Sequence, residues 1–238
     1  MNSISIVVPA FNEQSHIKPT VETICLFMDG ADRDYEVIVV DDGSADGTVD
    51  TARAVAASGK PLTIVSYEPN RGKGYAVRQG VMKSVKDTIL MTDADLSAPI
   101  DQLFKLENAL GESFDIVVGS REAAGAILLV RQPFYRRWGG RILNLVIRAF
   151  AVPGIRDTQC GFKLFRTEAA RSIFENTIID DFGFDVEVLY LARKMGYKTK
   201  EVGVIWSHQE GSKVRPIRDG LRILWDIIRM RTKRYRLN

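Results

Sequence analysis

The sequence predicts an α/β protein with a mostly parallel sheet that helices cover on both faces. Near-continuous runs of Val and Ile, such as those at 3–8 and 35–40, alternate with segments of helical character through the first half of the 238-residue chain. Strands with this composition are typical of sheets buried on both faces. Polar clusters follow several of these runs, and the carboxyl ends of parallel strands are where such folds bind ligands.

The first half alternates strands with helices. We expect strands at 3–8, 35–40, 62–67, 88–92 and 115–118, and helices at 13–27, 48–57, 74–85 and 100–110. Asp46 is the expected N-cap of the second helix, because a side-chain oxygen there accepts a free amide of the first turn. His16 is expected to be a solvated residue in the first turn of its helix.

The second half is less regular. We expect a basic amphipathic helix at 134–150, a strand at 161–165, helices at 168–174 and 185–195, a strand at 199–205, a polar loop at 207–213 and a basic helix within 213–238. Asp181, Asp185 and Glu187 precede or open the helix at 185–195, where acidic side chains favour the helix dipole, so capping is their expected role. A position near a bound acceptor is the alternative for Asp181 or Asp185.

Composition excludes several protein classes. A hydrophobic content of 45% supports one full core. Cys25 and Cys160 match no metal-ligand or redox spacing, so we expect a reduced, cytosolic protein with Cys25 in its core. The chain enters a strand at Ser3, so no signal peptide is expected. No window approaches 18 uncharged apolar residues, so no spanning helix is expected either.

The charge is unevenly distributed along the chain. Residues 123–156 hold six arginines and no acid, and residues 213–238 hold nine basic residues against Asp219 and Asp226. These segments therefore carry +6 and +7, while the whole chain carries +3 and the remainder −10. Such an asymmetry predicts a surface that meets an anionic partner.

Asp93-Ala94-Asp95 follows the apolar run at 88–92. Carboxylates at i and i+2 point the same way on a straight strand, and a divalent cation takes such hard oxygen ligands. For an isolated pair, a polar turn is the more common explanation. Here polar clusters at 9–13, 41–44 and 70–74 are expected at the same edge of the sheet, and this convergence favours a ligand site.

Two of these clusters suggest contacts with a nucleotide. In the segment 41–48, Asp42 suits a nucleoside, since carboxylates in α/β folds commonly accept ribose hydroxyls, while Asp46 and Thr48 suit a helix cap. Residues 71–74 open a helix with two glycines and two cations, where an anion can meet backbone amides. This second pattern matches neither the Walker motif nor the dinucleotide fingerprint.

Together the motifs resemble the inverting family 2 glycosyltransferases with a GT-A fold, and among them the polyprenyl-phosphate hexosyltransferases. The string Asp157–Phe165 is more similar to dolichyl-phosphate glucose synthases than to the mannose synthases. The resemblance extends over nearly the whole chain and rests on the segments 7–13, 41–48, 71–74, 93–95, 119–121, 157–165 and 211–213.

The resemblance implies one GT-A domain over 1–238. Residues 1–121 would form the nucleotide-sugar half, 122–212 the acceptor half with the interface helix 134–150, and 213–238 a basic helix. The nucleotide-sugar site would contain Pro9, Phe11, Glu13, Val40, Asp42, Lys73, Asp93 and Ala94.

It further implies roles for residues in the reaction. Asp93 and Asp95 would hold Mg²⁺ or Mn²⁺, with Ser97 as a doubtful further ligand where mannose synthases often carry Gln. Arg121, Arg136 and Lys213 would face the acceptor phosphate, and the catalytic set would be Asp95, Arg121 and Lys213. For Arg136, an ordinary surface charge is an equally favoured alternative. His208 closing over the donor is a less favoured possibility.

The expected function is metal-dependent, inverting transfer of a hexose from a nucleotide sugar to dolichyl or polyprenyl phosphate. UDP-glucose is the favoured donor, with GDP-mannose or a UDP-N-acetylhexosamine as alternatives. Because a phosphomonoester is mostly dianionic at neutral pH, we expect no dedicated general base. More distant alternatives are a membrane-bound regulatory protein with an inactive transferase fold and a non-catalytic basic protein that binds nucleic acid.

The two basic segments also predict where the enzyme acts. Phe134, Trp138, Ile142, Leu145 and Phe150 alternate with arginines, as do Leu221, Leu224, Trp225 and Ile228. Both patterns are typical of helices at a membrane interface beside anionic lipid, although ordinary core packing is the alternative. We therefore expect a peripheral protein on the cytoplasmic face of a membrane, with no nucleic-acid partner.

Overall fold

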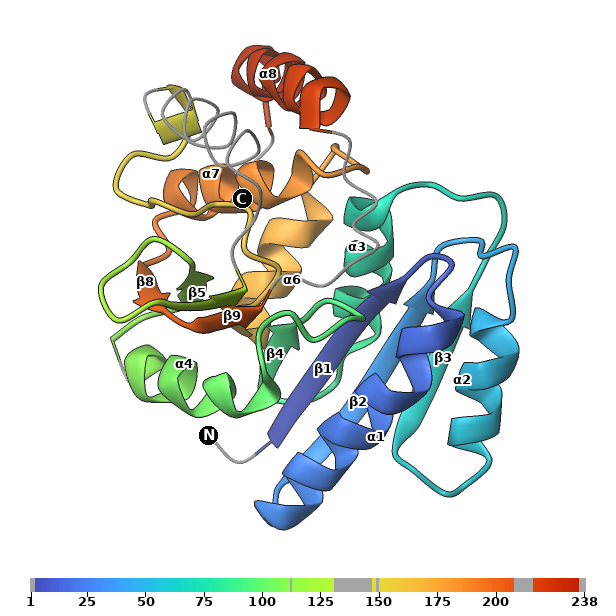
Figure 1. Ribbon diagram of the computed structural model, residues 1–238. Coiled ribbons are helices and arrows are strands. Elements are labelled where there is room, and N and C mark those ends of the chain that lie inside the picture. Colours follow the sequence, from blue (N-terminus) through green and yellow to red (C-terminus); the bar gives the residue numbers. More distant parts are fainter. Residues whose placement is uncertain (1–2, 112, 131–146, 149, 208–215, 236–238) are drawn as a thin grey trace.

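The computed structural model describes residues 3–111, 113–130, 147–148, 150–207 and 216–235 (Figure 1). Its strands are β1 Ser3–Ala10, β2 Asp34–Asp41, β3 Leu62–Ser66, β4 Thr88–Met91, β5 Ile116–Ser120, β6 Ile127–Val130, β7 Lys163–Arg166, β8 Thr199–Gly203 and β9 Ile205–Ser207. Its helices are α1 Gln14–Gly30, α2 Thr48–Ala56, α3 Lys73–Lys83, the 3₁₀ turn η1 Ile100–Gln102, α4 Leu103–Leu110, α6 Thr167–Glu175, α7 Phe184–Lys194 and α8 Pro216–Thr232. The alternating strands and helices expected for the first half are confirmed.

Seven strands form one sheet in the order β3-β2-β1-β4-β7-β5-β8. The pairs among β1 to β4 are parallel, and so is β5 with β8. β7 lies between β4 and β5 and is antiparallel to both. The mostly parallel sheet is therefore confirmed, and the antiparallel strand brings the segment before Lys163 to the edge where β4 ends.

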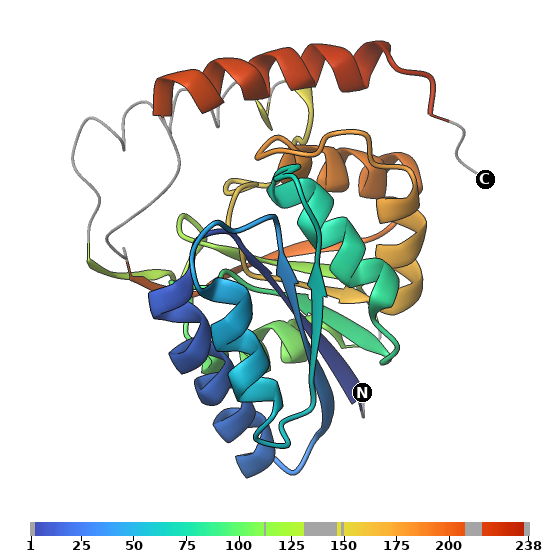
Figure 2. The same cartoon turned by 90° about the vertical axis from the view of Figure 1, so that its right-hand side faces the viewer.

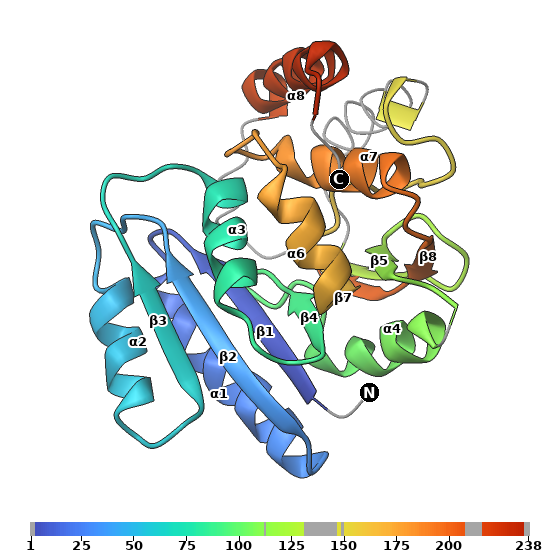
Figure 3. The same cartoon turned by 180° about the vertical axis from the view of Figure 1, so that it is seen from behind.

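Helices cover both faces of this sheet (Figures 1 and 3). One hydrophobic cluster joins the sheet to α1, α2 and α4, and its buried members include Ile17, Ala52 and Leu103. The other joins the sheet to α3, α6, α7 and α8, with Val77 and Leu189 among its members. Cys25 is buried in the first cluster as expected, and both cysteines are free.

The loops after β1, β2 and β3 interlock at the carboxyl edge of the sheet. The Asn12 amide donates to Ser44 Oγ at 2.8 Å, and Asn12 Oδ1 accepts the amide of Ala45 at 2.8 Å. The Arg71 amide reaches back to Asp42 Oδ1 at 2.8 Å. The polar clusters that the sequence placed at one edge are thus in mutual contact.

The expected N-cap of α2 was assigned one residue too early. Gly47 is the N-cap residue, while Asp46 Oδ1 accepts the Thr48 amide at 3.0 Å. Asp46 Oδ2 also lies 3.2 Å from the amide of Gln14, the first residue of α1. Asp46 therefore satisfies amides at two helix starts, a tertiary arrangement that local spacing does not reveal.

The second half departs from expectation in its strands. The segment expected as one strand at 199–205 is divided into β8 and β9, and β9 leaves the main sheet to pair in parallel with β6. β6 was not predicted, and its four apolar side chains are all exposed in the structure. Of the helix expected at 134–150, the described residues Ile147, Arg148 and Phe150 are helical, and the rest lies outside the described residues.

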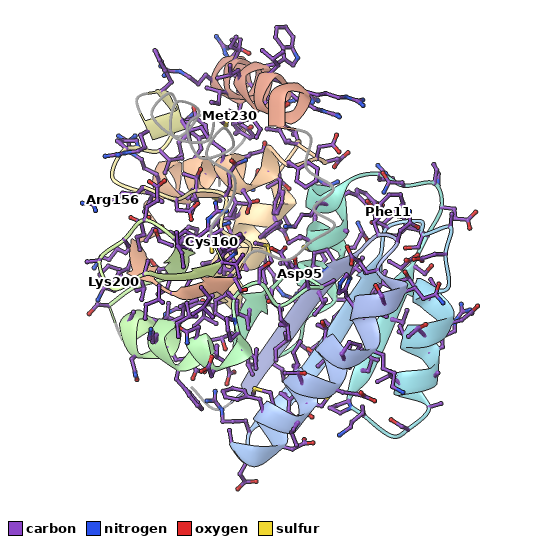
Figure 4. The ribbon with its side chains drawn as sticks, in the orientation of Figure 1. Phe11, Asp95, Arg156, Cys160, Lys200 and Met230 are labelled. Atoms are coloured by element: carbon purple, nitrogen blue, oxygen red, sulfur yellow. The ribbon has the colours of Figure 1, made fainter. Side chains whose placement is uncertain are left out.

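α8 lies across one end of the molecule, the end towards which the carboxyl ends of β1, β2 and β3 point (Figures 1 and 2). Ile223, Ile227 and Met230 are buried on its inner side, which Figure 4 shows for Met230. Among the residues that the structure describes, no helix is long and apolar enough to span a membrane.

Candidate active site

Asp95 lies in the turn that follows β4, near the middle of the molecule in the view of Figure 4. Its Oδ1 accepts the Ser97 amide and its Oδ2 the Ser97 hydroxyl, each at 2.9 Å. Leu96 takes a φ of +45°, a conformation that lets the chain turn back so that Ser97 meets the carboxylate. Ser97 thus orients Asp95, and direct ligation of a metal by its hydroxyl stays a prediction.

Asp93 is held by a cation. The Lys73 ammonium, at the first residue of α3, lies 2.5 Å from Asp93 Oδ1. Burial would raise the pKa of Asp93, but the charges of Lys73, Lys163 and Arg121 together outweigh it and the pKa is lowered. By contrast, burial raises the pKa of Asp95 and the Asp93 charge raises it further, against the hydrogen bonds from Ser97. The two carboxylates are therefore electrostatically unequal.

Gly161 permits the close approach of the 157–165 string to this carboxylate. A Cβ at Gly161 would lie 2.1 Å from Asp93 Oδ2, far inside van der Waals contact. The antiparallel direction of β7 brings this glycine back beside the end of β4. Gly161 belongs to the sequence motif 157–165, but only the fold shows that the Asp93 side chain occupies the space that a side chain at Gly161 would need.

Asp42 is buried and organises the loop that precedes α3. Its carboxylate accepts the amides of Arg71 and Gly72 and the side-chain amide of Asn70, each at 2.8 Å. The neighbouring Asp41 is equally buried, yet among the described residues its Oδ1 has no hydrogen-bond partner. Contact of Asp42 with a nucleoside stays a prediction, and Asp41 is the residue of this pair with a free acceptor.

The other residues expected around the nucleoside differ in how far they are exposed. Phe11 and Glu13 are partly exposed in the loop after β1, where Figure 4 shows Phe11. Pro9 and Ala94 are buried, so they form the floor of this edge. Val40 is an exception to the expected arrangement, because its side chain is fully buried in the core with α3 and does not face the loops.

Arg121 is fixed by Asp157, which is almost fully buried. Arg121 Nε and a terminal nitrogen each lie 2.7 Å from the two carboxylate oxygens, and the Arg121 amide donates at 2.9 Å. Burial would raise the pKa of Asp157, but Arg121 lowers it. Such a two-point contact sets the direction of the guanidinium plane. Asp157 is thus a site residue whose role the sequence did not reveal.

Lys163 and Asp185 form a second, deeper ion pair near Asp93. Their side chains are 1% and 5% exposed, and Lys163 Nζ also donates to the Cys160 carbonyl at 2.6 Å. The expected capping role of Asp185 is therefore wrong, because this side chain turns inward to Lys163 instead of to the amides of α7.

Glu187 also stands in the first turn of α7, as expected, but the contacts given for Glu187 and Asp181 go to groups other than the α7 amides. Glu187 is buried and accepts the amides of Ile178 and Ile179, which lie before α7, while Asp181 pairs with Arg222 of α8. His16 contacts Glu13 at 2.8 Å and is 42% exposed, as expected of a first-turn residue. Arg136, His208 and Lys213 lie outside the described residues.

Cys160 shows why no nucleophilic role falls to the thiols here. It is 1% exposed, and burial followed by the Asp157 charge raises the pKa of its thiol to about 12. A buried, protonated thiol is inert. The candidate reactive groups at this edge are therefore carboxylates, two lysines and an arginine.

Comparison with known proteins identifies the family of this chain. The family model "Glycosyl transferase family 2" matches residues 5–174. A dolichyl-phosphate beta-glucosyltransferase of Dictyostelium discoideum is 33% identical over 240 residues, covering 96% of this chain and 73% of that protein. The human protein of the same name is 32% identical over 243 residues, covering 97% and 75%.

Solved structures show the same fold. Glucosyl-3-phosphoglycerate synthase of Mycobacterium tuberculosis, in complex with Mn²⁺, UDP and glucosyl-3-phosphoglycerate, superimposes with a TM-score of 0.70 at 20% identity, covering 96% of this chain and 80% of that one. Its complex with Mg²⁺ and UDP gives a TM-score of 0.68 at 19% identity, covering 96% and 79%. From the family match and the fold together, this chain belongs to the family 2 glycosyltransferases with a GT-A fold and is a hexosyltransferase.

Proposed function

We propose that this enzyme transfers glucose from UDP-glucose to dolichyl or another polyprenyl phosphate, with inversion at the anomeric carbon. The observation that carries the proposal is the group of Asp93, Asp95, Lys73 and Arg121 at the carboxyl edge of the sheet. The names of the relatives in Dictyostelium and human support the acceptor and the sugar.

The carboxylates at this edge fit a divalent cation. Within the described residues, no lysine or arginine lies at ion-pair distance from Asp95, and Lys73 acts on its charge only at longer range. Asp93, Asp95, Asp157 and Asp185 face three cations, Lys73, Arg121 and Lys163, which leaves the group one negative charge in excess. Mg²⁺ is usually held by one or two carboxylates together with substrate phosphates. Asp95, with Asp93 beside it, would hold the ion.

The bound ion would stabilise the charge that develops on the departing nucleoside diphosphate. Lys73 contributes to the same stabilisation, because its ammonium stands at the start of α3, where the helix dipole also favours an anion. Lys73 therefore supports the diphosphate from the protein side.

The acceptor needs orientation more than activation. A phosphomonoester has a second pKa of about 6, so its attacking oxygen is already deprotonated at neutral pH. That oxygen forms the bond to the anomeric carbon while the bond from this carbon to the diphosphate oxygen breaks. Arg121, aimed by Asp157, would bind the acceptor phosphate with its planar guanidinium. Positioning of this kind can account for a large part of the rate acceleration in a reaction between two substrates.

The outer side of α8 supports action at a membrane. Leu221, Trp225 and Ile228 recur at helical spacing and are 64%, 65% and 54% exposed. Exposed arginines flank them, so the helix presents apolar and cationic groups together, as interfacial helices do. The inner side is core, and the exposed outer side supports the proposed contact with a membrane. The proposed location is the cytoplasmic face of a membrane.

A transfer assay tests the proposal. Purified enzyme with Mn²⁺ and dolichyl phosphate is given radiolabelled UDP-glucose, GDP-mannose or UDP-N-acetylglucosamine in parallel, and the organic phase is counted. We expect label from UDP-glucose. Label from GDP-mannose alone would replace the donor and keep the reaction class. Incorporation from none of the donors would overturn the proposal in favour of an inactive transferase fold.

A further inference from the structure

The buried Lys163–Asp185 pair lies outside the roles assigned so far. Lys163 opens β7 and is level with Met91 on β4 and Val118 on β5, so its backbone position is fixed by strands on both sides. Asp185 lies in the first turn of α7. Removing two charges from water is costly, and a buried ion pair gives little net stability. A pair at this depth beside a site therefore calls for a functional explanation.

Charges of alternating sign connect this pair to Asp93. Lys73 contacts Asp93 and also interacts electrostatically with Asp185, while Asp185 interacts with both Lys163 and Lys73. The four groups form one cluster, in which Asp93 pairs with Lys73 and Asp185 pairs with Lys163, and the charges of each pair act on those of the other. Lys73 contacts one carboxylate and interacts at longer range with the second, which is anchored by a lysine that is almost fully buried.

Backbone contacts hold this cluster in place. A Cβ at Gly74, next to Lys73, would lie 2.6 Å from Phe184 Cβ and 2.7 Å from the Ile179 carbonyl. The first turns of α3 and α7 therefore touch, with no space between Gly74 and Phe184. Because Lys73 and Asp185 adjoin these two residues in sequence, the contact also fixes the distance between their starting points.

We propose that Asp185 and Lys163 are positioning residues that keep the Lys73 ammonium directed at the donor diphosphate. Asp93 has two competing tasks, since it pairs with Lys73 and is expected to face the cation. When Asp93 is engaged elsewhere, Asp185 remains as the nearby carboxylate for Lys73, and Lys163 holds Asp185 in place. The inference rests on the proposed function only in assigning the diphosphate to Lys73.

A mutant cycle with UDP binding as the readout tests this. We compare wild type, Asp185→Asn, Lys73→Met and the double variant Lys73→Met/Asp185→Asn by calorimetric titration with UDP, with and without Mn²⁺. We expect Asp185→Asn to weaken UDP binding about tenfold, as loss of a charge-assisted contact does. In the Lys73→Met background the same change should have no further effect, because Asp185 acts through Lys73. An equal effect in both backgrounds would overturn the proposal.

Lys163 is tested by separating folding from binding. Lys163→Met or Asp185→Asn alone leaves a buried partner uncompensated and should lower the melting temperature, while Lys163→Met/Asp185→Asn should recover most of it. We expect the recovered double variant still to bind UDP about tenfold more weakly. Wild-type affinity in this folded variant would show a purely structural pair and overturn the proposal.

The matched control is the Arg33–Glu107 pair, whose side chains are 18% and 12% exposed and whose charged groups are 2.8 Å apart. Arg33→Met/Glu107→Gln should leave UDP affinity unchanged. Because UDP binding needs no acceptor, failure of lipid transfer would count against the proposed function alone, whereas the binding cycle would still decide the role of Asp185.

Discussion

Asp95 and Asp93 differ in what surrounds them, and this difference predicts unequal effects of mutation. Asp95 has Ser97 as its hydrogen-bond donor, while Asp93 has the Lys73 ammonium. A cation would relieve the unfavourable burial that raises the pKa of Asp95. Asp95 is therefore the carboxylate whose ionised form a bound cation would stabilise most.

Asp95→Asn should reduce hexose transfer by about 10³-fold, because removal of a group that stabilises developing charge has effects of this size. Ser97→Ala removes only the hydroxyl that orients Asp95 and keeps the amide contact, so a loss of about tenfold or less is expected. Initial rates at saturating Mn²⁺ measure both. If Ser97→Ala lost as much as Asp95→Asn, Ser97 itself would be a ligand.

Gly161→Ala should disable the site without a general loss of structure. The added methyl would meet Asp93 Oδ2 at 2.1 Å, so Asp93 must turn away from Lys73. Displacement of a reacting group by about 1 Å commonly costs about 10²-fold in rate. Gly30→Ala is the matched control, since nothing lies within 4 Å of its added methyl. Equal transfer rates of the two variants, measured at equal melting temperature, would contradict the steric argument.

At the scale of elements, α8 carries an acid on its buried side. Asp226 is 5% exposed, and its Oδ2 lies 2.4 Å from where a Gly183 Cβ would be, at the start of α7. Burial raises the pKa of Asp226, with Asp181 adding to the rise and Arg222 and Arg229 opposing it. The ionised form is thus disfavoured in the folded protein.

Asp226→Asn should therefore stabilise the protein at neutral pH. A raised folded-state pKa means that the penalty exists above that pKa and disappears as the pH falls towards the unfolded value of about 4. The gain in melting temperature, about 2–4 °C for each kcal/mol in a chain of this size, should be largest near pH 7.5 and vanish near pH 4. Asp50→Asn, at a side chain 86% exposed, is the control. A gain that does not change with pH would contradict this explanation.

Elements and site residues were predictable to different extents, for physical reasons. Buried parallel strands are recognisable in the sequence from continuous Val and Ile. Asp93 and Asp95 could be predicted because they come directly after the end of one such strand. The sequence did not predict that Asp157 contacts Arg121, that Gly161 makes room for Asp93 or that Lys163 pairs with Asp185. These contacts exist only once β7 runs antiparallel between β4 and β5. Strand direction depends on tertiary packing, which residue spacing does not encode.

Across the whole molecule, the segment between α6 and α7 connects α8 to the loop before α3. Asp181 pairs with Arg222, and Gly183 packs against Asp226 of α8. On the other side, the Asp180 carbonyl accepts the Tyr75 amide at 3.0 Å and lies against Gly72. The helix proposed to meet the membrane and the loop proposed to meet the donor therefore contact one segment.

Despite this connection, membrane binding should be separable from donor binding by mutation of exposed side chains of α8 other than Arg222. Trp225 and Ile228 are exposed, so replacing both by serine leaves the inner contacts of Ile227 and Met230 intact. Trp225→Ser/Ile228→Ser should lower binding to anionic vesicles in a sedimentation assay by about tenfold or more, since two large apolar side chains contribute several kcal/mol at an interface.

The same variant should bind UDP as the wild type does and should lose transfer only to acceptor embedded in vesicles, keeping transfer to a short, water-soluble polyprenyl phosphate. Leu26→Ser is the matched control, because Leu26 is 75% exposed on α1, away from this surface. Higher salt should weaken vesicle binding of the wild type, because the arginines of α8 act over only about 10 Å at 0.1 M salt. Vesicle binding that survives the double substitution would place the membrane contact elsewhere on the molecule.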